Sequence, residues 1–124
     1  NHIGVPLTVL SLSDEDVLVV EMGMNHKGEI HTLSNIVKPT IGIITNVGTA
    51  HIGNLGSREN ILKAKLEILE GIQDGGILII NNDNDLLNEW KKNYIGKINI
   101  VTYGIDNESD FMASNIVLNE NKER

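Results

Sequence analysis

Short apolar runs alternate with amphipathic stretches along this chain, and the alternation predicts its order of strands and helices. Runs rich in valine, isoleucine and leucine, which are typical of strands buried in a parallel sheet, cover residues 17–20, 41–44, 77–80 and 98–102. Helical spacing of apolar residues covers residues 28–37, 57–72 and 86–92. Strands that alternate with helices over short connections predict one α/β domain with a mainly parallel, doubly wound sheet.

Weaker patterns lie outside these runs. Residues 7–12 alternate between apolar and polar positions, which predicts an edge strand or an approach to one. Residues 111–118 alternate in the same way and predict an edge strand or an antiparallel strand. Residues 52–56 indicate a glycine-punctuated loop, and the charged residues 119–124 indicate a frayed end.

Composition and charge narrow the class of protein. The chain has 124 residues, 40% of them hydrophobic, which is enough for a packed core. Its formal net charge of −7 argues against binding to nucleic acid or to an anionic membrane, because both need clustered lysine and arginine. The lack of cysteine excludes disulfides and thiolate metal sites, and no apolar run approaches the length of a membrane span. We therefore expect a cytoplasmic protein with no nucleic-acid partner and no membrane insertion.

Polar residues that follow directly on the predicted strands are the first candidates for chemistry. Glu21 comes immediately after residues 17–20, where a carboxylate is costly unless it is paired, hydrogen-bonded or bound to a metal. Asn46 and His51 follow the strand at residues 41–44, at the strand end where α/β proteins place their sites. The same pattern fits an Asn46 that caps a turn and a His51 that is an ordinary loop residue, so both interpretations stay open.

The helix predicted at residues 57–72 separates two lysines that lie two positions apart. At about 100° per residue, Lys65 falls in the apolar arc that includes Ile61 and Ile68. Lys63 falls on the opposite, water-facing side. The glutamates on that side are Glu59, Glu67 and Glu70. A desolvated Lys65 would have a lowered pKa and a reactive neutral amine, but it could also extend its ammonium to solvent along the helix edge.

Four segments of the chain, in order and at matching spacing, resemble the Mur ligase family. These segments are residues 1–8, 21–30, 45–51 and 63–68. The second reads Glu-Met-Gly-Met-Asn-His-Lys-Gly-Glu-Ile, and its portion at residues 24–30 is the most specific, because other members of the family differ there. This portion resembles the branch of the family that adds D-alanyl-D-alanine to UDP-N-acetylmuramoyl-tripeptide in peptidoglycan synthesis.

The resemblance implies an ATP-dependent ligase that forms an amide bond. In this family ATP phosphorylates a terminal carboxylate of the substrate, and the incoming amine attacks the resulting acyl phosphate. Carried over residue by residue, the resemblance implies that Glu21 and His51 bind Mg²⁺ and that Lys65, as a carbamate, helps to hold this metal. It also implies that Asn1 and Asn46 lie close to the nucleotide phosphates. The expected partners are the two small-molecule substrates and the rest of the ligase chain.

One motif of the family is missing from these 124 residues. A glycine-rich phosphate-binding loop that ends in Gly-Lys-Thr or Gly-Lys-Ser occurs nowhere in the sequence, which also starts on Asn1 rather than methionine. The resemblance therefore implies that residues 1–124 are part of a central ATP-binding domain whose phosphate-binding loop lies upstream. We expect the chain by itself to bind ATP weakly and to be inactive.

Two alternatives to this function stay open. Another Mur-type ligase, such as folylpolyglutamate synthase or cyanophycin synthetase, would share the surroundings of His51 and Lys65 but matches less well at residues 24–30. A non-catalytic relative would use the sheet as a binding module. An intact phosphate-binding loop upstream would support an enzyme, and a degenerate one would support the binding module.

Overall fold

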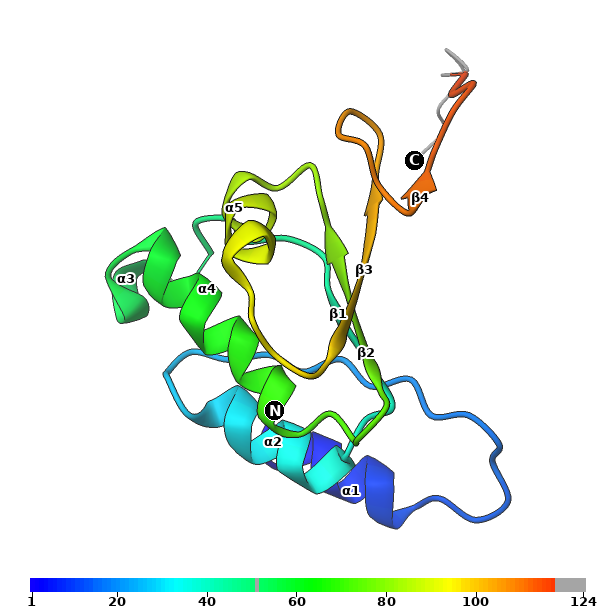
Figure 1. Cartoon of the computed structure of the whole chain (residues 1–124). Helices are drawn as coiled ribbons and strands as arrows, with labels where there is room; N and C mark the ends of the chain where they lie inside the picture. The colour runs from blue at the N-terminus through cyan, green and yellow to red at the C-terminus, as the bar shows by residue number, and fades with distance from the viewer. Residues whose placement is uncertain (51, 118–124) are drawn as a thin grey trace.

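A four-stranded parallel sheet is the centre of the molecule (Figure 1). The computed structural model describes residues 1–50 and 52–117. The strands are β1 (Ile41–Ile44), β2 (Ile77–Asn81), β3 (Asn99–Gly104) and β4 (Phe111–Met112), and they lie side by side in that order. Ile41 pairs with Ile77, and Ile77 pairs with Asn99, so the first three strands run in one direction and in register. The predicted parallel α/β sheet is confirmed.

The helices predicted at residues 57–72 and 86–92 are present at nearly the same positions. The described helices are α1 (Gly4–Leu10), α2 (Glu29–Val37), α3 (Ile52–Leu55), α4 (Arg58–Leu66), the 3₁₀ helix η1 (Glu67–Glu70) and α5 (Asp85–Asn93). The side chain of Ser57 accepts a hydrogen bond from the amide of Asn60 and begins α4. Asn84 begins α5 in the same way, by accepting from the amide of Leu87. The structure describes no helix that is long and apolar enough to cross a membrane.

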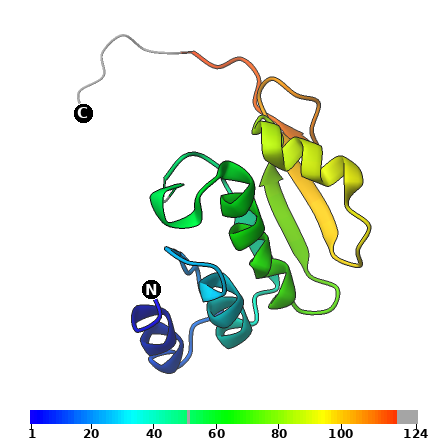
Figure 2. The ribbon, with the colours of Figure 1, turned by 90° about the vertical axis from the view of Figure 1, so that its left-hand side faces the viewer.

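The buried side chains of β1 and β2 lie on one face of the sheet. In Figure 1 the sheet is close to edge-on with α3, α4 and α5 on its left, and in Figure 2 α4 and α5 lie in front of the strands. Alternate positions of β1 and β2 point into this layer, where Ile44, Leu78 and Ile80 are buried against the helices. On the other face Ile41 and Ile43 are 53% and 55% exposed. The described residues therefore supply one of the two helical layers of a doubly wound sheet.

Two predictions for the first twenty residues are wrong. Residues 7–12 were expected to form an edge strand, but most of them belong to helix α1, whose start is capped by the side-chain oxygen of Asn1. Residues 17–20 were expected to form a buried strand, but they have no strand partner among the described residues, and Val17 and Val19 are 76% and 90% exposed. An apolar run becomes a strand only where a neighbour satisfies its backbone groups.

An edge strand is present from residue 111 as predicted, but it is short, and the antiparallel alternative for residues 111–118 is wrong. β4 has two residues and pairs parallel to β3, with Tyr103 opposite Phe111. The reason is the loop between the strands: the carboxylate of Asp110 accepts hydrogen bonds from the amide and the hydroxyl of Thr102, both at 2.8 Å. The loop thus returns to a point inside β3, and the chain then runs forward beside it. Residues 52–56, expected to be a loop, contain the short helix α3.

Candidate functional site

A polar cluster occupies the carboxyl ends of β1 and β2, where the sequence predicted a site. Asn46, the second residue after β1, accepts a hydrogen bond from the side-chain amide of Asn84 at 2.8 Å. The same amide group donates to the carbonyl of Val47 at 3.3 Å, while the oxygen of Asn84 caps α5. Asn46 is exposed to solvent, but its side chain is held at this edge by Asn84, the residue that caps α5.

The sequence analysis missed an ion pair that joins this cluster to two helices. Arg58, at the start of α4, donates to both carboxylate oxygens of Asp85, at the start of α5, over 2.9 and 2.5 Å. It also donates to the carbonyl of Val47 at 2.9 Å. Each of the two residues comes directly after the N-cap of its helix, Ser57 or Asn84, and that shared position is the signal that could have identified the pair.

Acid should weaken this ion pair. The hydrogen bonds from Arg58 lower the pKa of Asp85 from 3.8 to about 2. Because the folded-state pKa lies below the unfolded value, Asp85 stabilises the fold above pH 3.8, and this contribution is lost as the pH falls toward 2. We therefore expect Asp85→Asn to remove part of the loss of stability between pH 4 and pH 2, measured by urea unfolding at a series of pH values. Asp74→Asn, at an exposed position, is the control and should leave the pH profile unchanged.

Glu21 lies beside the N-terminus. It is exposed, and it lines an open hollow of about 250 Å³ together with Asn1 and residues of α1. The structure thus brings Glu21 and Asn1 together. The side-chain oxygen of Asn1 already accepts from the amides of Ile3 and Gly4, at 3.1 and 2.6 Å. Among the described residues, no hydrogen bond or ion pair links Glu21 to Asn46 or to Lys65.

The two lysines of α4 differ as their helical positions predicted. Lys63 is exposed, whereas Lys65 is half-buried beside the buried residues Ile61 and Ala64. Burial of the Lys65 ammonium removes part of its hydration and lowers its pKa. Of the two interpretations left open, the structure therefore favours a partly desolvated lysine.

The predicted metal ligands do not form a closed site in the part of the chain that the structure describes. No three histidine, cysteine, aspartate or glutamate side chains among residues 1–50 and 52–117 lie close enough to hold a metal ion. His51 lies outside the described residues. The assignment of Glu21, His51 and Lys65 to a metal site stays a prediction.

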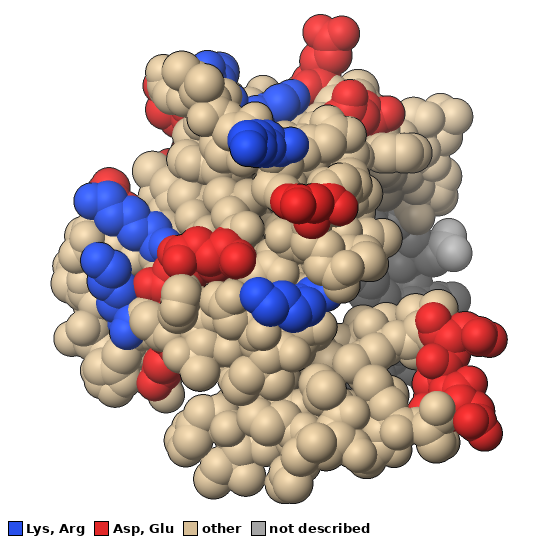
Figure 3. All heavy atoms as spheres, turned by 60° about the horizontal axis from the view of Figure 1, so that its bottom comes forward, with Lys and Arg blue, Asp and Glu red and all other residues tan. Residues whose placement is uncertain are grey.

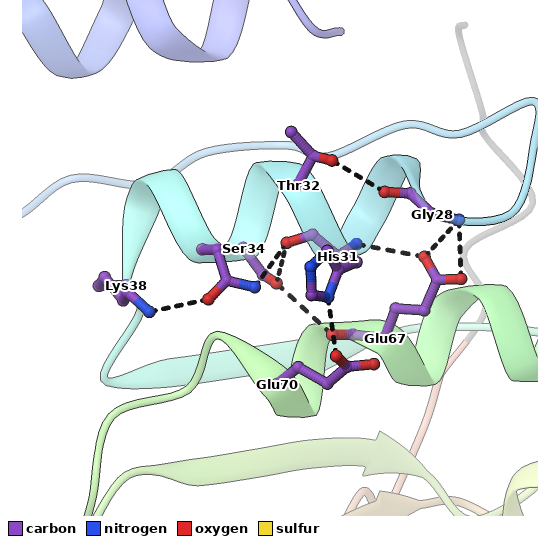
Figure 4. A network of polar contacts seen from close by, with 8 residues as sticks. Gly28, His31, Thr32, Ser34, Lys38, Glu67 and Glu70 are labelled. Carbon is purple, nitrogen blue, oxygen red and sulfur yellow. Dashed lines mark hydrogen bonds and ion pairs between the residues drawn. The ribbon is translucent and has the colours of Figure 1, made fainter.

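A second cluster, which the sequence analysis also missed, surrounds the carboxylate of Glu67 (Figure 4). Glu67 was placed on the water-facing side of its helix, but it is only 8% exposed. Its oxygens accept hydrogen bonds from the amide of Gly28 at 2.8 and 3.0 Å and from the amide of His31 at 3.2 Å. Beside it, the ring of His31 contacts the carboxylate of Glu70 at 2.7 Å. These contacts join η1 to the first turn of α2.

Charged side chains of both signs are mixed on the surface near these helices. Figure 3 shows one face of the molecule, where lysine and arginine side chains lie among aspartate and glutamate over much of the view, a group of acidic side chains gathers alone at the lower right, and no single basic patch forms. The face in view therefore resembles an ordinary solvated surface more than a site for a polyanion.

The parallel sheet, with polar residues gathered where its strands end, defines an α/β protein of the kind that binds ligands at that edge. The chain belongs to the Mur ligase family, because the Mur ligase middle domain matches residues 1–124. The UDP-N-acetylmuramoyl-tripeptide–D-alanyl-D-alanine ligase of Bacillus subtilis is 40% identical over 121 residues, which are 97% of this chain and 25% of that protein. The ligase of the same name from Synechocystis is 50% identical over 108 residues, 86% of this chain and 23% of that protein.

Solved structures of the family have the same fold. A crystal structure of MurF from Acinetobacter baumannii matches with a TM-score of 0.80 and 36% identity, over 94% of this chain and 25% of that one. MurF ligase from Thermotoga maritima, solved in complex with ADP, matches with a TM-score of 0.74 and 30% identity, over 84% of this chain and 24% of that one. The chain thus spans about a quarter of the length of the relatives that it matches.

Proposed function

We propose that a ligase containing this chain joins D-alanyl-D-alanine to UDP-N-acetylmuramoyl-tripeptide at the expense of ATP, as a step of peptidoglycan synthesis. The observation that carries the proposal is the agreement along almost the whole chain with ligases that bear this name, which are 36–50% identical to it in different bacteria. The segment at residues 24–30, the most specific of the four resembling segments, supports the same substrates. The substrates and ATP place this reaction in the cytoplasm.

The proposed chemistry has two steps. The γ-phosphate of ATP passes to the terminal carboxylate of the tripeptide, which forms an acyl phosphate and releases ADP. The amine of D-alanyl-D-alanine then attacks the acyl carbon, and the amide forms as phosphate leaves and the amine loses a proton. Of the relatives, the Thermotoga ligase was solved with ADP, which supports a nucleotide site in this fold.

We assign five residues of this chain to the site. Glu21, His51 and a carbamylated Lys65 would hold Mg²⁺, and Asn1 and Asn46 would lie close to the phosphates. Two observations support the assignment: Glu21 and Asn1 line one open hollow, and Lys65 is half-buried beside an apolar core. Carboxylate and carbamate oxygens are the ligands that Mg²⁺ prefers. When bound, Mg²⁺ would neutralise the negative charge that develops on the transferred phosphoryl group.

A coupled assay tests this function directly. A purified ligase that contains residues 1–124 should release ADP only when ATP, UDP-N-acetylmuramoyl-tripeptide and D-alanyl-D-alanine are all present, and mass spectrometry should find the amide product. A parallel assay with a folate in place of the tripeptide and glutamate in place of the dipeptide distinguishes the folylpolyglutamate type of ligase. ADP release with glutamate, or with no acceptor at all, would contradict the proposal.

The 124-residue chain alone is the control in the same assay. It should release no ADP and should bind Mg-ATP too weakly for calorimetry at micromolar concentration. The sequence has no Gly-Lys-Ser or Gly-Lys-Thr, and its net charge of −7 opposes a polyanion. Micromolar affinity of this chain for Mg-ATP would show that its nucleotide site does not depend on such a loop.

A further inference from the structure

Glu67 is a buried acidic residue for which the proposed chemistry has no direct use. It lies where α4 ends at Leu66 and the chain continues as the 3₁₀ helix η1. Its carboxylate is nearly excluded from solvent and makes three hydrogen bonds, all to backbone amides at the start of α2 (Figure 4). Burying a carboxylate to this extent costs free energy unless its oxygens accept hydrogen bonds, and here both oxygens do.

The start of α2 depends on this carboxylate because it has no cap of its own. The residue before the helix is Gly28, whose φ of 91° is in the left-handed region and which has no side chain to accept from the first amides. Glu67 fills that role from 39 positions further along the chain. Its negative charge also lies at the positive end of the helix dipole, where it is favoured.

A second carboxylate fixes the turn that precedes α2. Glu29 accepts hydrogen bonds from the amides of Asn25 at 2.6 Å and His26 at 3.1 Å. Together with the bond from Gly28 to Glu67, this leaves three of the four backbone amides of residues 25–28 bound to carboxylates. The side chains of residues 25–27 are exposed. The backbone of this turn is therefore fixed while its side chains face solvent.

Glu67 thus connects two parts of the site that we assign to the ligase. On one side it holds the turn at residues 25–28, which follows Glu21 by a few residues. On the other side it follows Lys65 by two residues in the same helical segment. We propose that Glu67 is a positioning residue of the ligase: its carboxylate fixes the turn after Glu21 against the helix that carries Lys65. This inference rests on the proposed function.

Two substitutions in a ligase that contains this chain test the role. Glu67→Ala removes every acceptor for the amides of Gly28 and His31, so hydrogen exchange of a peptide that covers residues 25–31 should become faster, by about tenfold. Turnover should fall by roughly 10–100-fold, as it does when residues that orient metal ligands are lost. Glu67→Gln keeps one acceptor oxygen in place, and it should restore part of both the protection and the turnover.

Glu70→Ala is the matched control. Glu70 lies on the same 3₁₀ helix and also contacts α2, but through the ring of His31 at an exposed position. It should leave exchange and turnover within about twofold of wild type. In addition, the bicarbonate concentration for half-maximal activity should rise in Glu67→Ala and stay unchanged in Glu70→Ala, because only the first substitution disturbs the surroundings of Lys65.

The possible outcomes distinguish a failure of the positioning role of Glu67 from a failure of the proposed ligase function. Unchanged exchange in Glu67→Ala and Glu67→Gln would overturn the proposed contact. Faster exchange with unchanged turnover and bicarbonate dependence would show that Glu67 only caps a helix, and the positioning role would be wrong. An inactive wild-type ligase would overturn the proposed function itself, and it would be recognised before any variant is compared. Should Glu67→Ala fail to fold, the same comparisons are made with Glu67→Gln.

Discussion

Lys65→Ala, made in a ligase that contains this chain, should reduce turnover by at least about 100-fold, whereas Lys63→Ala should change it by less than about twofold. The two lysines have the same charge and lie two positions apart on α4, but only Lys65 is half-buried beside Ile61 and Ala64. In the proposed site the Lys65 amine would react with dissolved CO₂ and lose a proton, and the carbamate oxygens would serve as ligands for Mg²⁺.

The measurement is kcat for ADP release with saturating substrates, at normal bicarbonate and after its removal. Wild type and Lys63→Ala should both lose activity when bicarbonate is removed and regain it when bicarbonate is restored. The residual activity of Lys65→Ala should change neither when bicarbonate is removed nor when it is restored. Equal and mild losses in the two variants would show that Lys65 is only a surface lysine of the helix.

Gly71→Ala should destabilise the fold by about 3 kcal/mol, at the upper end of the usual cost of overpacking. Gly71 is buried at the end of η1, and a Cβ atom there would lie 2.4 Å from both the carbonyl carbon and the carbonyl oxygen of Ser34 in α2. Backbone atoms cannot rotate out of the way as a side chain can, so η1 and α2 would have to separate.

Urea unfolding of the chain, followed by fluorescence of its single tryptophan Trp90, measures this loss. Gly23→Ala is the control, because a Cβ atom at Gly23 would meet nothing within 4 Å. It should leave the midpoint close to that of the wild type. A wild-type midpoint in Gly71→Ala would mean that the two helices do not pack as closely as described.

Local sequence patterns predicted the strands that find a partner within the described sheet and the helices that have a clear N-cap. The strand at residues 41–44 and the cap at Ser57 were predicted at the correct residues. The strand at residues 17–20 was wrong because strand formation needs a partner, and propensity alone does not supply one. The same limit explains the edge strand at residues 7–12, where a capped start at Asn1 made a helix instead.

For the candidate site, too, sequence patterns predicted some residues correctly and missed others. Helical periodicity was enough to distinguish Lys65 from Lys63, because both lie within the regular turns of α4. It failed two residues later, at Glu67, because the side of the helix that was expected to face water is covered there by the start of α2. The partner of Glu67 lies at Gly28, and no pattern within one helix can indicate a contact so distant along the chain.

The outer edge of β1 has a consequence for how the chain behaves in solution. β1 is the last strand on its side of the described sheet, so one row of its backbone groups has no ladder partner, and its isoleucines are half-exposed on the uncovered face. An open edge of this kind is a template for any extended apolar segment, and residues 17–20 of a second copy have the right composition. Self-association and aggregation at high concentration should therefore start at residues 41–44, even though they belong to the most regular part of the fold.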